Sequence, residues 1–510
     1  MSYKNIDIFF ISLLSTFILY AVQINLSFGL WDEGFLWYGV QRTMLAEIPI
    51  RDFMAYDPGR YYWCSSIMTL LGSSSLIALR VSIGIFQLIG VYLSLKVLKE
   101  YYKGNYPLSF LLFCSIIISL WMIPQHKVFD MVSSILILYS LYRYSDELTE
   151  RRALYLGITI GFVAFFGRNH GVYGVISSIF VMIFYGFSKK IGIKAQFINF
   201  SIGIIVGYLP MIAMIFFIDG YFSSFIDSIL FIFSQGKTNI TLPVPWLWII
   251  NYMTATVKDI LVSFLFTFMP LYSAFAFIFL INKTIKNNNS DSLLVCSVFL
   301  NLAYMHFAFS RADIAHLSQS IFPMLLWFLY ILSRMEKLIP FCFLSATILL
   351  FSSEIMFSRH PIYNYFFGIY KKVIIDEQIF YVSKKTEYDI NFIRKSTKNI
   401  PDIDNEILIV PYWPGAYALL RIKSPFWESY ALFDRDEDFQ YRELEKIKKV
   451  KPSIVIINNS SLDKDDSLKY KNTHKVIYSY IIDNYDLVDS VMNKKYYVYQ
   501  IKKQNNVFLY

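Results

Sequence analysis

Apolar residues form long, nearly unbroken runs through the first 360 positions, and short polar loops separate these runs. A run of about 20 apolar residues can cross the hydrocarbon core of a bilayer as a helix. The pattern therefore predicts a polytopic α-helical membrane protein with about eleven spans, at 6–28, 75–98, 106–123, 128–144, 153–168, 171–188, 197–218, 258–281, 292–309, 317–333 and 339–357. The pairs within 106–144 and 153–188 are predicted to be tight hairpins.

The pattern changes near residue 358, because 43 of the 85 Lys, Arg, Asp and Glu residues lie in the last 150 positions. We predict a transmembrane domain at 1–357 and a soluble α/β domain at 358–510. Strand patterns at 406–410 and 452–458 flank a helical pattern at 441–450, which indicates a parallel strand pair. A further strand is predicted at 496–501. Neither early strand is followed by a glycine-rich phosphate loop, so nucleotide binding is disfavoured in this domain.

Basic residues indicate how the spans are oriented, because Lys and Arg concentrate in cytoplasmic loops. With a cytoplasmic N-terminus, the cytoplasmic ends carry Lys4, Lys96, Lys99, Lys103, Arg143, Arg151, Arg152, Lys189, Lys190, Lys194, Lys283, Lys286, Arg334 and Lys337. An odd number of spans then places the C-terminal domain outside the cytoplasm. We expect a multi-pass protein of the inner (plasma) membrane with a periplasmic or extracellular C-terminal domain.

Composition narrows the class further. Hydrophobic residues make up 56% of the chain and charged residues 17%, against about 25% charged residues in soluble domains. This excludes a soluble globule and a nucleic-acid-binding protein, so the net charge of +9 has to be read by position along the chain before a partner is inferred from it. Four cysteines in 510 residues exclude a disulfide scaffold.

The predicted first outer loop, residues 29–74, is long and carries unusual polar residues. Asp32 and Glu33 follow the first span closely, within the motif Trp31-Asp32-Glu33-Gly34. A carboxylate pair at the bilayer boundary is partly desolvated and could act as a base or bind a metal or other cation. The alternative is that both residues cap a helix that begins near Gly34. The same loop also contains Asp52, Tyr56 and Arg60.

The later outer loops add basic residues, which are His126, Lys127, Arg168, His170, Arg311 and His316, together with Asp313. Arginine, lysine and histidine gathered at one membrane face suit a phosphate or pyrophosphate group. The alternative for each residue alone is an interfacial charge that reaches water. Carboxylates at 32, 33, 52 and 313 could hold Mg²⁺ or Mn²⁺, although the residues do not show that they converge. The apolar loop 219–250 is either an interfacial segment or a lid.

These residues resemble membrane glycosyltransferases of the GT-C superfamily, of the protein mannosyltransferase and aminoarabinose transferase type. The resemblance rests on Trp31-Asp32-Glu33-Gly34, and the same loop extends it with Tyr38, Arg42, Pro49, Arg51-Asp52-Phe53 and Tyr56-Asp57-Pro58-Gly59. The span pattern, the R-N-H-G and R-A-D-I-A-H loops and the α/β tail also fit.

The resemblance implies transfer of one sugar from a polyprenyl-phosphate-linked donor to an extracytoplasmic acceptor, with inversion at the anomeric carbon. Lipopolysaccharide, another envelope glycan, a lipid or a protein could be the acceptor. By the same resemblance Asp32 is the general base, and Glu33 orients it or helps to bind a metal. Arg168, Arg311 or His316 would hold the carrier phosphate. The absence of a W-W-D-Y-G-type motif argues against transfer of a whole glycan.

Three other classes compete with this interpretation. A transporter or flippase of lipid-linked sugars would have broken helices and polar residues near mid-membrane. A polysaccharide polymerase or ligase would also use a large outer loop. A non-catalytic scaffold would tolerate substitutions in every outer loop. The polar set at one face favours the enzyme.

Overall fold

The computed structural model describes residues 3–100, 108–236, 238–286, 289–398, 400, 406–491 and 495–502. Two compact units make up the chain. The first, which we name the membrane unit, comprises Met1–Ile24, Asp57–Arg60 and Arg80–Phe367. The second, the sheet unit, comprises Asn25–Tyr56, Tyr61–Leu79 and Gly368–Tyr510.

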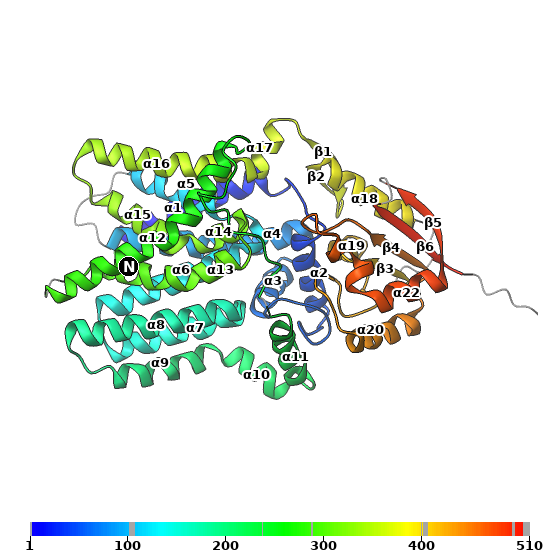
Figure 1. The fold of residues 1–510 in the computed structure, drawn as a ribbon, viewed down its shortest axis with the longest axis horizontal. Coiled ribbons are helices and arrows are strands. Elements are labelled where there is room, and N and C mark those ends of the chain that lie inside the picture. The colour runs from blue at the N-terminus through cyan, green and yellow to red at the C-terminus, as the bar shows by residue number, and fades with distance from the viewer. Residues whose placement is uncertain are drawn as a thin grey trace, which may run out of the picture. The chain divides into compact units, whose positions relative to one another are not determined.

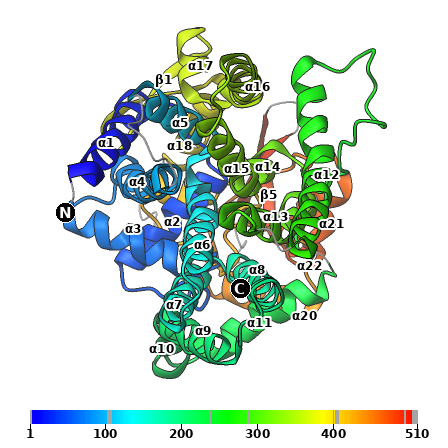
Figure 2. The same ribbon diagram turned by 90° about the vertical axis from the view of Figure 1, so that its left-hand side faces the viewer.

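The membrane unit is helical (Figure 1). Its elements are α1 (Tyr3–Gln23), α4 (Leu76–Glu100), α5 (Leu108–Trp121), η1 (Gln125–Lys127), α6 (Val128–Asp146), α7 (Glu150–Phe166), α8 (Arg168–Lys189), α9 (Lys194–Gly207), α10 (Leu209–Phe217), α11 (Tyr221–Ser234), α12 (Val257–Ile285), α13 (Ser292–Ser310), α14 (Ile314–Ser320), α15 (Phe322–Ser333), α16 (Leu338–Met356), η2 (Phe357–Arg359) and α17 (Pro361–Phe366). Figure 2 views most of the long helices end-on.

Every segment predicted to span the membrane contains a helix within the described residues. Five helices there are long and apolar enough to cross a bilayer, and the number rises to eight if each of three bent pairs counts as one span. The bent pairs are α5 with η1–α6 at 98°, α9 with α10 at 55°, and α14 with α15 at 59°. The chain is therefore a multi-pass membrane protein. The count of eleven and the orientation stay predictions, and Lys103 lies outside the described residues.

Helices α7 and α9 pack unusually closely, and Figures 1 and 2 both show them side by side. A Cβ atom on Gly157 of α7 would lie 2.1 Å from the Phe200 carbonyl oxygen, and one on Gly207 of α9 would lie 2.1 Å from the Ile158 carbonyl oxygen. Glycines spaced by four residues on both helices let the two backbones touch. This is a common way to associate helices in a membrane, where lipid and side chains are equally apolar.

The sheet unit contains two sheets. Its elements are α2 (Asp32–Met44), α3 (Gly59–Leu70), β1 (Tyr370–Ile375), β2 (Gln378–Ser383), α18 (Lys384–Thr397), β3 (Ile407–Val410), α19 (Pro414–Leu420), α20 (Glu437–Val450), β4 (Ile454–Asn458), η3 (Asp466–Leu468), α21 (Tyr470–Thr473), α22 (Lys475–Asn484), β5 (Tyr485–Val491) and β6 (Tyr496–Ile501). The first two residues of α3 belong to the membrane unit, and the first four residues of α4, Leu76–Leu79, belong to the sheet unit.

The larger sheet has the strand order β3-β4-β6-β5. Strands β3 and β4 are parallel, with Leu408 opposite Val455, and the other pairs are antiparallel. The predicted strand–helix–strand unit and the predicted strand at 496–501 are confirmed. Side chains from β3, β4 and β6 form one core with α20 and α22, which includes Leu444, Ile447 and Ile477.

Most of the first loop folds together with the C-terminal segment. Residues 25–27 extend the β1–β2 hairpin, because the Ser27 amide donates to the Tyr381 carbonyl at 2.7 Å. Farther along, the Met54 amide donates to the Trp427 carbonyl at 2.9 Å, and the Trp427 indole donates to the Ile50 carbonyl at 2.9 Å. Residues 57–60 leave this unit and belong to the membrane unit, so one loop supplies residues to both.

Candidate functional site

A buried ion-pair network anchors Arg60 within the membrane unit. The guanidinium lies 3.0 Å from Asp130 Oδ1 and donates to the Phe166 carbonyl at 2.9 Å. Asp130 is the third residue of α6, and its side chain is only 7% exposed. Gly59 allows this approach, because a Cβ there would lie 2.7 Å from the Phe165 carbonyl oxygen. Arg60 therefore joins the first loop to α6 and to the end of α7.

His170 shares the same carboxylate. Its Nε2 lies 2.9 Å from Asp130 Oδ1, and its Nδ1 lies 2.8 Å from the Tyr304 hydroxyl on α13. Only 2% of the His170 side chain is exposed. Two predicted site residues, Arg60 and His170, are thus brought together by Asp130, which was not among the predicted site residues.

Arg168 is held by a second carboxylate of the first loop. Its Nε lies 2.6 Å from Asp57 Oδ1, and its backbone amide donates to Asp57 Oδ2 at 2.9 Å. The Arg168 guanidinium also donates to the Ser228 hydroxyl of α11 at 2.9 Å and lies over the Phe225 ring. Its side chain is 22% exposed, so part of this cation faces outward.

Arg311, Asp313 and His316 form a compact cluster between α13 and α14. Asp313 caps α14 by accepting from the His316 amide at 2.9 Å, and its carboxylate also lies 2.9 Å from His316 Nδ1 and 3.0 Å from Arg311 Nε. Burial alone would raise the pKa of Asp313, but the His316 hydrogen bonds and the Arg311 charge outweigh it and lower that pKa. The carboxylate stays ionised and orients both the Arg311 and the His316 side chains.

The same cluster fastens the chain that follows α11. Arg311 donates to the Ile240 carbonyl at 3.0 Å, and His316 Nε2 lies 2.9 Å from the Asn239 amide nitrogen. The segment predicted as an interfacial stretch or lid thus contacts this cluster.

The basic groups of the later loops converge through one aromatic ring. The Phe307 ring lies 5.5 Å from that of His170 and 5.4 Å from that of His316, measured between centroids. Arg168 is two residues before His170 and belongs to the same end of α8. His126 and Lys127 occupy η1, directly before α6, and both are half-buried. One end of the membrane unit therefore collects the predicted phosphate ligands.

In the sheet unit, Asp32 begins α2 and is half-buried. Its Oδ1 accepts a hydrogen bond from the Tyr430 hydroxyl at 3.3 Å. Burial, followed by the charge of Asp32, holds the pKa of Tyr430 well above its ordinary value, so this phenol remains a donor. The Phe35 ring packs between the rings of Tyr56 and Tyr430, which places Tyr56 beside the same group.

The alternative that Asp32 and Glu33 cap a helix beginning near Gly34 is wrong, because the helix begins earlier. Helix α2 begins at Asp32, its N-cap is Trp31, and no side chain caps it. Asp32 and Glu33 instead lie in the first turn, where negative charge is favourable beside the helix dipole. Glu33 is 8% exposed. The next residue has to be a glycine, because α2 packs closely against α19 at this point. A Cβ on Gly34 would lie 2.5 Å from the Gly415 Cα.

The Asp52 carboxylate is held by neighbours within its own loop. It forms an ion pair with Arg51 at 2.8 Å and accepts from the Ile48 amide at 2.7 Å. Burial would raise the pKa of Asp52, but these hydrogen bonds outweigh it and lower that pKa. Within the described part of the chain, no three His, Cys, Asp or Glu side chains are grouped so that they could hold a metal ion.

Asp57, Asp130, Tyr304 and Tyr430 were absent from the predicted site. Asp130 had a usable signal, because a carboxylate in an otherwise apolar helix needs a partner. Asp57 lies within the motif Tyr56-Asp57-Pro58-Gly59, but no role was predicted for it. Tyr430 had no local signal, since it is 398 residues from Asp32 in the chain.

Comparison with solved structures shows that the chain shares its fold with a known membrane protein. The chain is similar to ArnT from Cupriavidus metallidurans, a structure bound to undecaprenyl phosphate, with 8% sequence identity, a TM-score of 0.55 and 99% coverage of both chains. It is also similar to the oligosaccharyltransferase AglB from Archaeoglobus fulgidus, in complex with an inhibitory peptide and a dolichol-phosphate. That match has 10% identity and a TM-score of 0.48, and it covers 99% of this chain and 75% of AglB.

No protein-family model matches the sequence, and no curated protein does. The predicted fold class, a polytopic helical membrane protein with a C-terminal α/β domain, is confirmed.

Proposed function

We propose that this protein is a membrane glycosyltransferase that moves a single sugar from a polyprenyl-phosphate-linked donor to an extracytoplasmic hydroxyl acceptor. The observation that carries the proposal is the convergence of Arg168, His170, Arg311 and His316 at one end of the membrane unit. The likeness of the whole chain to ArnT, solved with undecaprenyl phosphate, adds support. Lipopolysaccharide, another envelope glycan, a lipid or a protein would be the acceptor.

The carrier phosphate is both the group to be bound and the leaving group. Arg168, Arg311 and His316 are each partly exposed, while a carboxylate orients each one. Such preorganised hydrogen-bond donors can stabilise the charge that develops as the phosphate departs, without having to reorganise first. Buried Arg60 and His170 act differently in this proposal, because they position the end of α7 and the start of α8 around Arg168.

Asp32 supplies the base in this proposal. A hydroxyl acceptor is a poor nucleophile near neutral pH, and a positioned base contributes roughly 10²–10⁴-fold. The Asp32 carboxylate would accept the proton, and it is held in place by the Tyr430 hydroxyl and by its position in the first turn of α2. Attack opposite the departing phosphate inverts the anomeric carbon. Glu33 would orient Asp32 from the same turn.

The decisive experiment uses the full-length protein in liposomes with a labelled polyprenyl-phosphate sugar. An enzyme releases polyprenyl phosphate and transfers the label to an acceptor in an envelope extract. A flippase instead moves the intact donor between leaflets and releases no polyprenyl phosphate. Movement of the donor without transfer would overturn the proposal.

We also propose that the C-terminal segment lies outside the cytoplasm, as the Lys and Arg distribution predicts. A C-terminal fusion to a reporter that works only in the cytoplasm should stay silent, and the same reporter after Lys190 should be active. An active C-terminal fusion would reverse the topology.

A further inference from the structure

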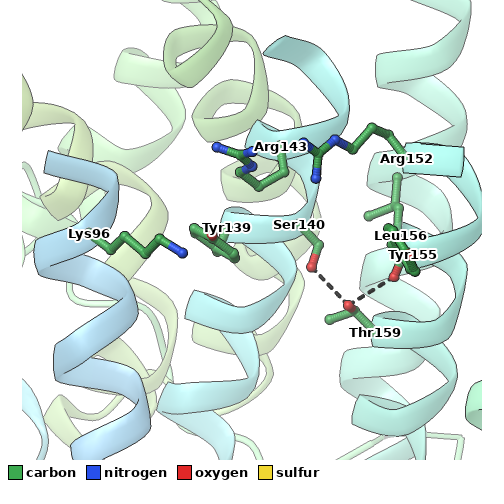
Figure 3. A pocket seen from close by; sticks show the side chains of 8 residues that line it. All are labelled: Lys96, Tyr139, Ser140, Arg143, Arg152, Tyr155, Leu156 and Thr159. Atoms are coloured by element: carbon green, nitrogen blue, oxygen red, sulfur yellow. Dashed lines mark hydrogen bonds between the residues drawn. The ribbon is translucent and has the colours of Figure 1, made fainter. Parts of the chain in front are cut away.

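A pocket of about 350 Å³ lies within the membrane unit, between α4, α6 and α7 (Figure 3). It is lined by Lys96, Tyr139, Ser140, Arg143, Arg152, Tyr155, Leu156 and Thr159. None of the proposed catalytic or phosphate-binding residues lines it. The pocket therefore calls for a separate explanation.

Its lining is rich in basic residues. Three of the eight lining residues are cations, and none of the eight is a carboxylate. The Lys96 ammonium lies 5.3 Å from the centre of the Tyr139 ring. Arg152 contacts Glu147 at 2.9 Å, but the Glu147 side chain is 57% exposed, and such surface pairs are weak. Figure 3 shows the Arg152 guanidinium turned toward that of Arg143.

The pocket also offers hydroxyl groups and an apolar wall. The Ser140 hydroxyl donates to Thr159 Oγ1 at 2.9 Å, which joins α6 to α7 (Figure 3). Leu156 is buried at the wall, and Tyr155 is 44% exposed beside it. A ligand with an anionic head, polar ester groups and an apolar continuation matches this order of groups.

The depth of the pocket fits a lipid headgroup. Arg143 is three residues before the end of α6, Arg152 is the third residue of α7, and Lys96 is four residues before the end of α4. Asp130 lies 13 positions before Arg143 on α6, which is about 20 Å along a helix axis. The pocket and the proposed carrier-phosphate site are thus at opposite ends of the same helix.

We propose that this pocket binds the phosphodiester headgroup of an anionic glycerophospholipid in the leaflet opposite the proposed catalytic end. Arg143 and Arg152 would hold the phosphate oxygens, because guanidinium groups match them with paired hydrogen bonds. Basic pockets between membrane helices are suited to such headgroups. By the predicted orientation this is the cytoplasmic leaflet.

The test is native mass spectrometry of the full-length protein in detergent with equal amounts of phosphatidylglycerol and phosphatidylcholine. The parent should retain phosphatidylglycerol preferentially. The double variant Arg143→Gln/Arg152→Gln should bind it roughly 25-fold more weakly, about fivefold for each cation removed. The control Lys190→Gln removes an exposed cation that directly follows α8 and does not line the pocket, so it should leave lipid binding unchanged.

One further variant and one competition experiment complete the test. Arg143→Lys keeps the charge but loses the paired hydrogen bonds, so it should weaken phosphatidylglycerol binding while folding normally, even if the double variant unfolds. Inorganic phosphate at millimolar concentration should not displace the lipid. Displacement by phosphate, equal retention of phosphatidylcholine, or unchanged lipid binding in a folded Arg143 variant would each overturn the proposal.

Discussion

In each unit of this molecule, a buried carboxylate is held by an arginine and a histidine. In the membrane unit, Asp130 lies 3.0 Å from Arg60 and 2.9 Å from His170. In the sheet unit, Glu428 lies 2.6 Å from Arg435 and 2.8 Å from His474, and its side chain is fully buried. Burial alone would raise the pKa of Glu428, but Arg435 and His474 outweigh it, so that pKa is lowered.

The second triad changes how the first is understood. Arg60 and His170 were predicted to bind substrate, since basic residues near a membrane face suit a phosphate. The Glu428 triad has the same chemistry where no site was predicted. An arginine–carboxylate–histidine triad is therefore also a means of joining distant segments, and in the proposed function Arg60 and His170 position Arg168.

The largest expected effect comes from breaking either triad. Asp130→Asn and Glu428→Gln should each lower the free energy of unfolding by about 3–5 kcal/mol, because a buried arginine loses its counter-charge. Chemical denaturation of the detergent-purified proteins measures this. Asp438→Asn, which changes an exposed carboxylate in the first turn of α20, is the matched control and should stay within about 0.5 kcal/mol.

Activity then separates the two triads. Sugar transfer per folded molecule should fall for Asp130→Asn, because the end of α8 that carries Arg168 loses its support. Glu428→Gln should leave it unchanged. Full activity of folded Asp130→Asn protein would show that its triad, like that of Glu428, is purely structural.

Asp32→Asn should show the opposite pattern, with an intact fold and little activity. Turnover should fall roughly 100-fold or more, since asparagine cannot accept the proton. Asparagine keeps an oxygen for the Tyr430 hydroxyl, so stability should change little. Sugar transfer by the purified variant, with donor binding checked separately, gives the result.

Asp438→Asn again serves as a control, as it also removes a first-turn carboxylate from a helix of the sheet unit. Activity of Asp32→Asn within a few-fold of the parent would exclude Asp32 as the base. Glu33 and Asp52 would then be the candidates.

Local patterns along the chain were sufficient for much of the fold. Alternating and continuous apolar runs identified β3, β4 and β6, and the hydropathy of the spans identified the membrane helices. Strands β1, β2 and β5 were missed. Two of them, β1 (Tyr370–Ile375) and β5 (Tyr485–Val491), mix charged and apolar residues. The hairpin turn between β1 and β2 uses Asp376 and Glu377 at positive φ, without the glycine that signals such a turn.

The candidate site was less predictable, because its pairings cross the chain. The sequence pattern identified Arg168 and Arg311 as candidates, and it also identified Asp313, the partner of Arg311. Asp57, the partner of Arg168, could be found only from the structure, because the two residues are 111 positions apart. Asp32 likewise depends on Tyr430, which reaches it from the C-terminal segment. Spacing along a sequence carries no information about such pairs.

Arg311→Ala should weaken donor binding by roughly tenfold, which corresponds to the loss of one charge-assisted hydrogen bond to phosphate. Titration of a polyprenyl-phosphate sugar into the purified variant measures this. Arg421→Ala removes an arginine that is likewise paired with a single aspartate, Asp376 at 2.8 Å, and should bind donor normally. Unchanged affinity in Arg311→Ala would remove Arg311 from the phosphate site.

The smallest effect concerns pH, and its sign is opposite to that of the Glu428 triad. Burial raises the pKa of Asp389 to about 6, although the Tyr496 hydroxyl donates to it at 2.8 Å. Folding therefore favours the protonated form, and this contribution is lost as pH rises through 6. From pH 7 to pH 5, the free energy of unfolding should increase by about 1 kcal/mol from this group.

Denaturation of the parent and of Asp389→Asn across this pH range tests the assignment. The variant should lose that increment and be at least as stable as the parent at pH 7. The Glu428 contribution has the reverse sign, since its lowered pKa makes it disappear only on acidification below the ordinary glutamate range. An identical pH profile for the parent and Asp389→Asn would contradict the raised pKa.

The pairing of residues 25–27 with β2 has a consequence for biosynthesis. Asn25 and its partner Ile379 are 354 residues apart, so the ribosome makes the loop long before its partner exists. At about 5–20 residues per second, that interval is roughly 20–70 seconds. Throughout this time the nascent loop has been made but cannot complete its hydrogen bonds. Protection of this loop during translation is thus a requirement set by the topology of the chain.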